Sequence, residues 1–165
     1  MPLLRHSIQT IVRRDRYMSR RRLSGFAHRG RQRLIGPIIT GPISRLHVSP
    51  TAGLSNVIIN TIGGRVEIGD YVLFGHDVLL LTGTHDFRLT GHERQLNRPT
   101  TNRHIVIESG VWIASRAIIL GPCRIGANAV IGSGCIVDFD VPADTLIRVR
   151  QELIKETIKY VNCEN

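Results

Sequence analysis

Seven histidines occur in this chain of 165 residues, and His85 has the surroundings that best suit proton transfer. It lies in the polar segment Thr82-Gly83-Thr84-His85-Asp86, and an imidazole ring gains or loses its charge near neutral pH. Such a histidine can act as a general base, taking the proton of a hydroxyl group as that hydroxyl attacks. Asp86 is adjacent, but neighbouring side chains on an extended chain point apart, so we expect a solvated carboxylate there.

A six-residue repeat must position this segment. Aliphatic β-branched residues recur at every sixth place: Ile107, Ile113, Ile119, Ile125, Ile131 and Val137. A small or apolar residue lies two places before each: Ile105, Val111, Ala117, Cys123, Ala129 and Cys135. Upstream the spacing returns in another frame, at Ile62, Ile68, Phe74 and Leu80, with Val66, Val72 and Val78 two places before the last three. A helix needs a period near 3.6 and a lone strand simple alternation, so this pattern predicts short strands joined by tight turns.

Three such strands would make one triangular coil, and stacked coils would bury a continuous apolar column, as in solenoids. The sixth-place aliphatics and the residues two before them would point inward, because side chains two apart share a face of a strand. Residues 43–60 are apolar but fit the period poorly, and we interpret them as a first, irregular coil. The predicted fold class is therefore all-β.

A polar, basic insert interrupts the repeat between Thr82 and Ile105. A long loop at about 83–104 that protrudes from a regular solenoid is a candidate for function, and His85 lies where the repeat stops. Residues 138–142 break the repeat again, and a helix over about 150–161 is expected to cap the open end. We divide the chain into a basic N-terminal arm that is expected to be helical (1–35), a β-helix domain (36–147) and a C-terminal capping helix and tail (148–165).

These motifs resemble the hexapeptide-repeat acyltransferases, specifically the galactoside, maltose and nodulation-factor O-acetyltransferase branch. The resemblance covers about residues 56–143, and its most specific pieces are Ile68-Gly69-Asp70-Tyr71-Val72, Thr82-Gly83-Thr84-His85, Gly110-Val111-Trp112-Ile113-Ala114-Ser115 and Val130-Ile131-Gly132-Ser133-Gly134. It implies a left-handed parallel β-helix and a homotrimer with active sites between subunits. It also implies transfer of an acetyl group from acetyl-CoA to a hydroxyl of a sugar or glycan.

The resemblance also implies roles for individual residues. His85 would be the general base, and the main-chain NH of Ser115 would stabilise the oxyanion formed at the thioester carbonyl. The main-chain NH of Ser133 would bind the pantetheine arm of coenzyme A. Trp112 falls on an outward position and would line the coenzyme A groove, with packing between subunits as the alternative role.

The acceptor side is less sharply defined. An asparagine of the first coil holds the acceptor in the family, and here either Asn60 or Asn56 matches it. Asp86 is a further substrate-binding candidate, beside its more ordinary role as a solvated carboxylate.

The chain departs from the family where coenzyme A phosphates are bound. Family members often carry Thr-Lys before an Asp-Ile-Pro-Pro segment, whereas here Asp138-Phe139 precede Asp140-Val141-Pro142-Ala143. The family's Asn-Pro-Ala-Lys ending is replaced by Arg148-Val149-Arg150-Gln151. We therefore expect Arg148 to contact the phosphates, with Arg124 and Arg150 as alternatives. The acyl group itself is also open.

The net charge of +9 belongs to the N-terminal arm. Residues 1–35 hold ten Arg and one acid, which gives +9, and the rest holds twelve basic and twelve acidic residues, which gives zero. We favour packing of the arm's apolar face on the β-helix, with weak membrane-surface contact. A transit peptide is an alternative, and no nucleic-acid partner is expected, because the arm lacks interleaved aromatic residues.

Location is expected to be cytoplasmic, with peripheral contact at the inner membrane face as an option. No apolar run is long enough to cross a bilayer, and no secretory signal follows Met1. The three cysteines, Cys123, Cys135 and Cys163, show neither metal nor paired spacing, which favours a reducing compartment.

Four other functions fit the fold. An antibiotic acetyltransferase of the virginiamycin or chloramphenicol type shares the fold and the base, whereas a non-catalytic β-helix scaffold needs neither His85 nor the insert. A carbonic-anhydrase-like zinc enzyme needs two histidines at HxxxxH spacing, and no such pair occurs, so no metal is expected. A serine acetyltransferase usually carries a large N-terminal helical domain, which 35 residues cannot supply.

Overall fold

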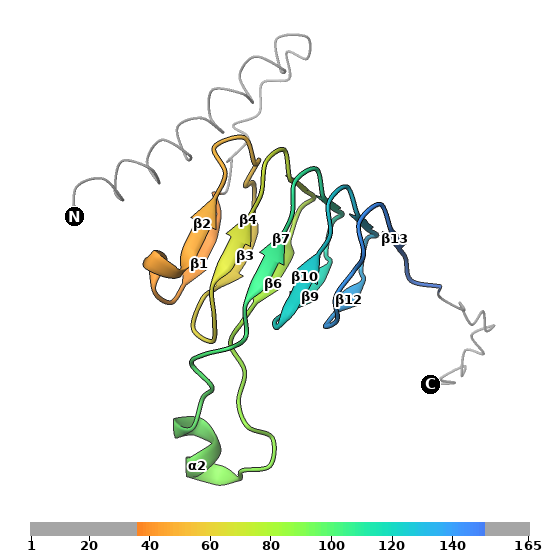
Figure 1. Ribbon diagram of the computed structural model, residues 1–165. Coiled ribbons are helices and arrows are strands. Elements are labelled where there is room, and N and C mark those ends of the chain that lie inside the picture. The colour runs from red at the N-terminus through yellow and green to blue at the C-terminus, as the bar shows by residue number, and fades with distance from the viewer. Residues whose placement is uncertain (1–35, 151–165) are drawn as a thin grey trace, which may run out of the picture.

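The strands pair in parallel and form three sheets that run along one axis (Figure 1). The computed structural model describes residues 36–150. Sheet A contains β1 (Ile38–Thr40), β3 (Val57–Asn60), β6 (Val78–Leu81), β9 (Ile118–Leu120) and β12 (Ile136–Val137). Sheet B contains β2 (Leu46–Val48), β4 (Val66–Ile68), β7 (Ile105–Ile107) and β10 (Cys123–Ile125). Sheet C contains β5 (Leu73–Phe74), β8 (Trp112–Ile113), β11 (Val130–Ile131) and β13 (Leu146–Ile147).

From β3 to β12 the chain visits the three sheets in turn, so each coil adds one strand to each side of a triangular solenoid. In the first and last coils one side is formed only by a single bridge, Gly53 to Leu73 on sheet C and Val141 to Ile125 on sheet B. This architecture is the left-handed parallel β-helix, and the predicted fold class is confirmed. A short 3-10 helix, η1 (Ile43–Arg45), lies in the first coil, and one α-helix, α2 (Gly91–Leu96), lies in the loop that leaves the solenoid after β6 (Figure 1).

The core is the predicted apolar column. The sixth-place residues from Ile107 to Val137 are all at most 1% exposed, and the strand register stacks each on its equivalent in the next coil, as Ile113 on Ile131. Full burial of one such side chain contributes about 1.5–3 kcal/mol. Repeating that contribution in every coil is what holds the short strands together.

The upstream part of the repeat differs from the prediction at its first member. Ile62 is only partly buried, and the inward place belongs to Ile59, which pairs in register with Leu80. The next inward residue of this kind, Ile68, follows nine places later instead of six, so the corner between β3 and β4 contains three extra residues. Counting back six residues from Ile68 therefore ends at Ile62 in the corner, and not at the inward residue Ile59.

Both ends of the solenoid also extend beyond the predicted repeat. β1 pairs with β3, so the first coil starts at Ile38 rather than at residue 43, and β3 already belongs to the second coil. Residues 138–142 do not end the solenoid, because Val141 bridges to Ile125 and β13 pairs with β11. The predicted N-terminal arm and C-terminal capping helix lie in residues 1–35 and 151–165, outside the described residues, and the division into three segments stays a prediction.

The outward faces of the sheets differ in character. The register places an apolar column on sheet A, formed by Ile38, Ile58, Leu79, Ile118 and Ile136. Sheet C carries a similar column, formed by Leu73, Trp112, Val130 and Leu146. The equivalent column on sheet B is His47, Glu67, Val106 and Arg124. Sheet B is therefore the sheet whose outer face is best suited to solvent exposure. Within residues 36–150, no helix is long and apolar enough to span a membrane.

Candidate active site

The base of the protruding loop is fixed by hydrogen bonds to the adjacent coil. Asn60 Oδ1 accepts the main-chain NH groups of Gly83 (3.1 Å) and Ile62 (3.0 Å). The fully buried Thr82 hydroxyl donates to Asn60 O at 2.8 Å. Across the neck of the loop, Arg103 Nε donates to Thr82 O at 2.8 Å. A side chain at Gly83 would meet Asn60, with its Cβ 2.8 Å from Oδ1, so this glycine permits the close approach.

His85 lies two residues beyond this base, and its ring is bound to α2. The Nδ1 atom lies 2.7 Å from the main-chain oxygen of Arg94. Because a carbonyl oxygen only accepts hydrogen bonds, the contact requires the proton on Nδ1. The other nitrogen, Nε2, then carries the free lone pair, which is the form that a general base needs. His85 is exposed, and no described residue bonds to Nε2.

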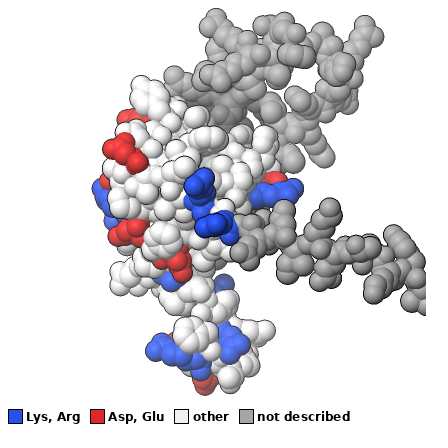
Figure 2. All heavy atoms as spheres, turned by 90° about the vertical axis from the view of Figure 1, so that its right-hand side faces the viewer, with Lys and Arg blue, Asp and Glu red and all other residues white. Residues whose placement is uncertain are grey.

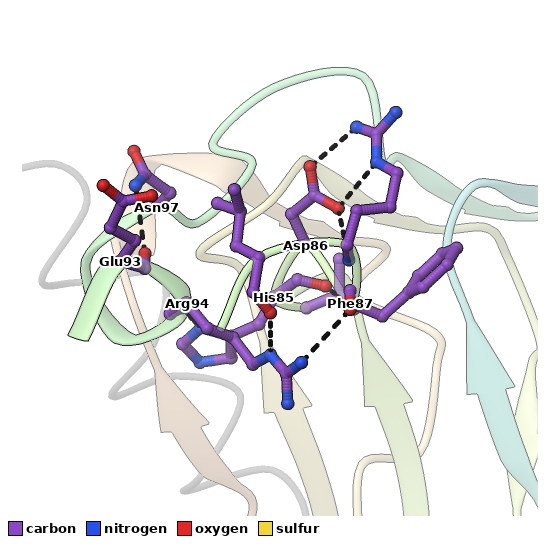
Figure 3. A network of polar contacts seen from close by, with 9 residues as sticks. His85, Asp86, Phe87, Glu93, Arg94 and Asn97 are labelled. Atoms are coloured by element: carbon purple, nitrogen blue, oxygen red, sulfur yellow. Dashed lines mark hydrogen bonds and ion pairs between the residues drawn. The ribbon is translucent and has the colours of Figure 1, made fainter. Parts of the chain in front are cut away.

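Asp86 is bound to Arg88 and not to His85 (Figure 3). Its carboxylate accepts hydrogen bonds from Arg88 Nε at 2.9 Å and Nη2 at 2.6 Å, and from the Arg88 main-chain NH at 3.0 Å. These hydrogen bonds lower the pKa of Asp86 to about 2. Both oxygens are thus engaged within the loop, as expected for a carboxylate that does not orient the histidine.

A pocket of about 600 Å³ lies at a different corner, where sheet C passes into sheet A. Its lining comes from equivalent turn positions of successive coils: His76, Asp77, Ser115, Arg116, Ser133, Gly134 and Val149. It therefore runs along the solenoid axis, and contains both serines that the sequence singled out for donor binding. His76 and Arg116 were not predicted to contribute. The signal that could have shown it is the repeat itself: His76 occupies the turn position equivalent to Ser115 and Ser133, and Arg116 directly follows Ser115.

The main-chain NH groups of Ser115 and Ser133 are available in this pocket. Neither donates to another residue of the described range, whereas the equivalent NH of His76 is taken up by Ser115 Oγ at 3.1 Å. A Cβ on Gly75 would lie 2.3 Å from Ser115 N, so glycine at this place keeps the adjacent backbone uncrowded. The Arg116 side chain adds a positive charge to the same pocket, which favours a developing oxyanion.

Trp112 lies on the outer face of sheet C and is 50% exposed, which confirms that it points outward. It pairs in register with Leu73 and Val130, and Ser115 follows it by three residues. Trp112 is not among the residues that line the pocket, so its contact with a donor stays a prediction. This position suits either a ligand wall or a surface between subunits.

The loop and the pocket lie at opposite edges of sheet A. The loop leaves after β6 of sheet A and returns at β7 of sheet B, whereas the pocket lies between sheets C and A. One copy of the chain therefore does not bring His85 to Ser115. The two asparagines separate in the same way: Asn60 lies at the loop, and Asn56 Nδ2 donates to Asp77 Oδ1 at 2.5 Å beside the pocket.

Comparisons with known proteins agree with this geometry. Residues 104–138 match the family described as bacterial transferase hexapeptide (six repeats). A galactoside O-acetyltransferase of Lactococcus lactis is 37% identical over 81 residues, which are 47% of this chain and 36% of the relative. A serine acetyltransferase of Buchnera aphidicola is 30% identical over 129 residues, which are 70% and 45% of the two chains. A solved galactoside acetyltransferase in complex with coenzyme A superposes with a TM-score of 0.52 and 27% identity, covering 67% and 58%.

Residues 104–138 thus carry the hexapeptide-repeat transferase pattern, and the chain is similar to acyltransferases of this family. The predicted family and its galactoside and maltose O-acetyltransferase branch are confirmed. The chain spans less than half the length of the two curated relatives.

In this hexapeptide-repeat protein the three arginines considered for phosphate binding occupy different places. Arg124 lies on sheet B and is ion-paired with Glu108, so it faces away from the pocket. Arg148 and Arg150 flank Val149, which lines the pocket, and Arg148 is exposed. No group of three or more metal-binding side chains is found within residues 36–150.

Proposed function

We propose that this chain is an acetyl-CoA-dependent O-acetyltransferase that acts on a hydroxyl of a sugar or glycan. The observation that carries the proposal is the orientation of His85, whose Nδ1 is held by Arg94 O and whose Nε2 is left for proton transfer. The pocket offers the Ser115 and Ser133 NH groups as hydrogen-bond donors, which would stabilise the oxyanion and bind the pantetheine arm of the donor. The family and the coenzyme A complex of a structural relative favour acetyl-CoA as the donor.

The proposed reaction has two steps. His85 Nε2 takes the proton of the acceptor hydroxyl as its oxygen attacks the thioester carbonyl. The negative charge that forms on the carbonyl oxygen is stabilised by the Ser115 NH. The intermediate then collapses: the carbon–sulfur bond breaks, the imidazolium returns the proton to the thiolate, and the products are the acetyl ester and free coenzyme A.

The donor would lie along the corner pocket. A groove that runs over successive coils suits an extended ligand, and the Ser133 NH would contact the pantetheine arm. Trp112 would form the apolar wall, and Arg148 would contact the phosphates at the C-terminal end of the groove, where the chain lacks the family's lysine.

The proposed assembly is a homotrimer with active sites between subunits. His85 and Ser115 lie at the two edges of sheet A, so a complete site needs the loop corner of one copy beside the pocket corner of the next. A contact between two different corners is heterologous, and repetition of it closes into a ring. The apolar outer column of sheet A would then face the centre of the ring, where burial is favourable.

The acceptor would be held beside His85, and Asn60 is the better placed of the two asparagines. Its Oδ1 is engaged by Gly83 and Ile62, while no partner within residues 36–150 is recorded for its Nδ2. An amide donor at this point suits a hydroxyl-rich acceptor. Peripheral membrane contact through the arm, in a cytoplasmic location, remains part of the proposal.

The testing experiment measures thiol release from acetyl-CoA with galactosides, maltose, serine and chloramphenicol as acceptors. We expect turnover with a sugar, and a loss of about 10²- to 10⁴-fold in kcat for His85→Ala, because the proton acceptor is removed. His92→Ala is the matched control, since His92 is an exposed histidine of the same loop. It should retain wild-type turnover.

Three results would contradict parts of this proposal. Full activity of His85→Ala would exclude His85 as the base. Turnover with chloramphenicol but no sugar would favour the antibiotic acetyltransferase alternative. An absence of acetyl-CoA binding would favour a scaffold.

A further inference from the structure

Arg94 connects two parts of the loop through three hydrogen bonds (Figure 3). Its main-chain oxygen accepts from His85 Nδ1 at 2.7 Å. Its guanidinium donates in the opposite direction, from Nε to Leu89 O at 2.5 Å and from Nη2 to Phe87 O at 3.2 Å. One residue of α2 therefore holds the histidine by its backbone and the segment just after the histidine by its side chain.

The carbonyl that holds His85 belongs to the last turn of α2. The helix ends at Leu96, and the main-chain NH of the following residue, Asn97, donates to Glu93 O at 2.9 Å. Arg94 O is therefore one of the terminal carbonyls left without a helical partner. It is free to accept the imidazole NH, and it does so only while α2 stays in place against residues 85–89.

No buried side chain of α2 anchors the helix in that place. None of its residues is buried, and Phe87 is 84% exposed, with its ring pointing away from the network (Figure 3). The Asp86–Arg88 ion pair stiffens only the segment 86–88. Among the described contacts, the Arg94 guanidinium supplies the hydrogen bonds that join α2 to the chain following His85.

We propose that the Arg94 side chain is a positioning residue that fixes the protonation form of His85. By holding α2 against residues 87–89, it keeps Arg94 O within reach of Nδ1, so the proton stays on Nδ1 and the lone pair stays on Nε2. Without the guanidinium, the carbonyl moves away and the ring is free to adopt the other neutral form or to rotate. This inference rests on the proposed role of His85 as the base.

Arg98 offers a matched control within the same loop. Figure 2, which looks along the solenoid from its C-terminal end, shows basic side chains gathered on the loop. Arg98 carries the same charge as Arg94 and is exposed, but no hydrogen bond of its side chain to another described residue is recorded. A change in loop charge alone would act equally through either arginine.

The test compares Arg94→Gln, Arg94→Lys and Arg98→Gln with the wild type. Long-range ¹H–¹⁵N spectra report which ring nitrogen of His85 carries the proton, with His85→Ala used to assign its signals. We expect the Nδ1–H form in the wild type and in Arg98→Gln, a mixture of forms in Arg94→Gln, and partial recovery in Arg94→Lys. Since displacement of a catalytic group by about 1 Å can cost about 10²-fold, kcat of Arg94→Gln should fall about 10- to 100-fold with KM for acetyl-CoA unchanged.

The outcomes separate the two proposals. An Nδ1–H form in Arg94→Gln, or an equal loss of kcat in Arg98→Gln, would overturn the role of Arg94. If the spectra change as expected but the wild type transfers no acetyl group, Arg94 positions His85 and the proposed function fails. Circular dichroism should show the same β-helix in all variants, because the loop lies outside the core.

Discussion

The groups proposed for donor binding depend on which corner of the solenoid each residue occupies. Ser115, Ser133 and Val149 lie at equivalent turns and share one pocket. Arg148 precedes Val149, whereas Arg124, eligible by charge alone, lies on sheet B with Glu108 as its partner. An arginine at the C-terminal end of the pocket is therefore the better phosphate ligand.

Arg148→Gln should raise KM for acetyl-CoA by about tenfold, because a charge-assisted hydrogen bond to phosphate contributes about 1.5–3 kcal/mol and is weakened by exposure. KM for acetyl-pantetheine, which lacks the phosphates, should stay unchanged. Steady-state kinetics with both donors measure this, with Arg124→Gln as the control. A similar rise in KM with both donors would assign Arg148 a structural role.

Each short strand places alternate side chains in the core, and this fixes the chemistry of the cysteines. Cys123 begins β10 and points inward, two residues before Ile125, and is 4% exposed. Burial, helped by the negative charges of Asp140 and Asp138, raises the pKa of its thiol from 9.0 to about 12. The reactive species is the thiolate, so the folded strand keeps this cysteine inert.

Cys123 should resist iodoacetamide at about pH 8.5 in the folded protein and react after unfolding in guanidinium. The folded state keeps the proton that the unfolded state loses above pH 9, so the free energy of unfolding should also decline as pH rises from about 9 towards 12. Peptide mass mapping of the alkylated cysteines measures the first effect. Equal labelling before and after unfolding would show that β10 does not bury this side chain.

At the scale of the whole molecule, the sheets differ in the side chains that they present outward. Sheet B presents charged side chains, and sheet A presents an unbroken apolar column between the two corners that carry the halves of the site. A face of this kind between two half-sites suits contact with further copies of the chain. A substitution that prevents assembly should therefore also abolish activity.

Ile118→Asp should convert the proposed trimer into monomers, because it places a charge in the centre of the sheet A column. Val106→Asp is the matched control, since Val106 is also partly buried and lies at the outward place of sheet B. Light scattering coupled to size-exclusion chromatography measures the mass of each variant. An assembled Ile118→Asp variant, or a monomeric wild type, would contradict the proposed interface.

The sequence by itself determined the repeat, the inward residues from Ile105 to Val137, the place of the loop and the resemblance to hexapeptide-repeat acyltransferases. These follow from local spacing, because side chains two apart share a strand face and every coil repeats the same pattern. The prediction from sequence was wrong at Ile62. One corner has three extra residues, so Ile62 keeps the six-residue spacing but does not occupy the inward place. A shift of this kind changes which residues face the core, and only contacts with the next coil reveal it.

The tertiary structure decided everything that depends on neighbours from other coils or from the loop. It placed Asn60 beside the loop and Asn56 beside the pocket, and it brought Arg94 O to His85 across nine residues. It also set the loop and the pocket at separate corners. The sequence gives only the order of residues along the chain. Stacking of the coils decides which residues lie at the same corner, and a catalytic site requires residues that are close together in space.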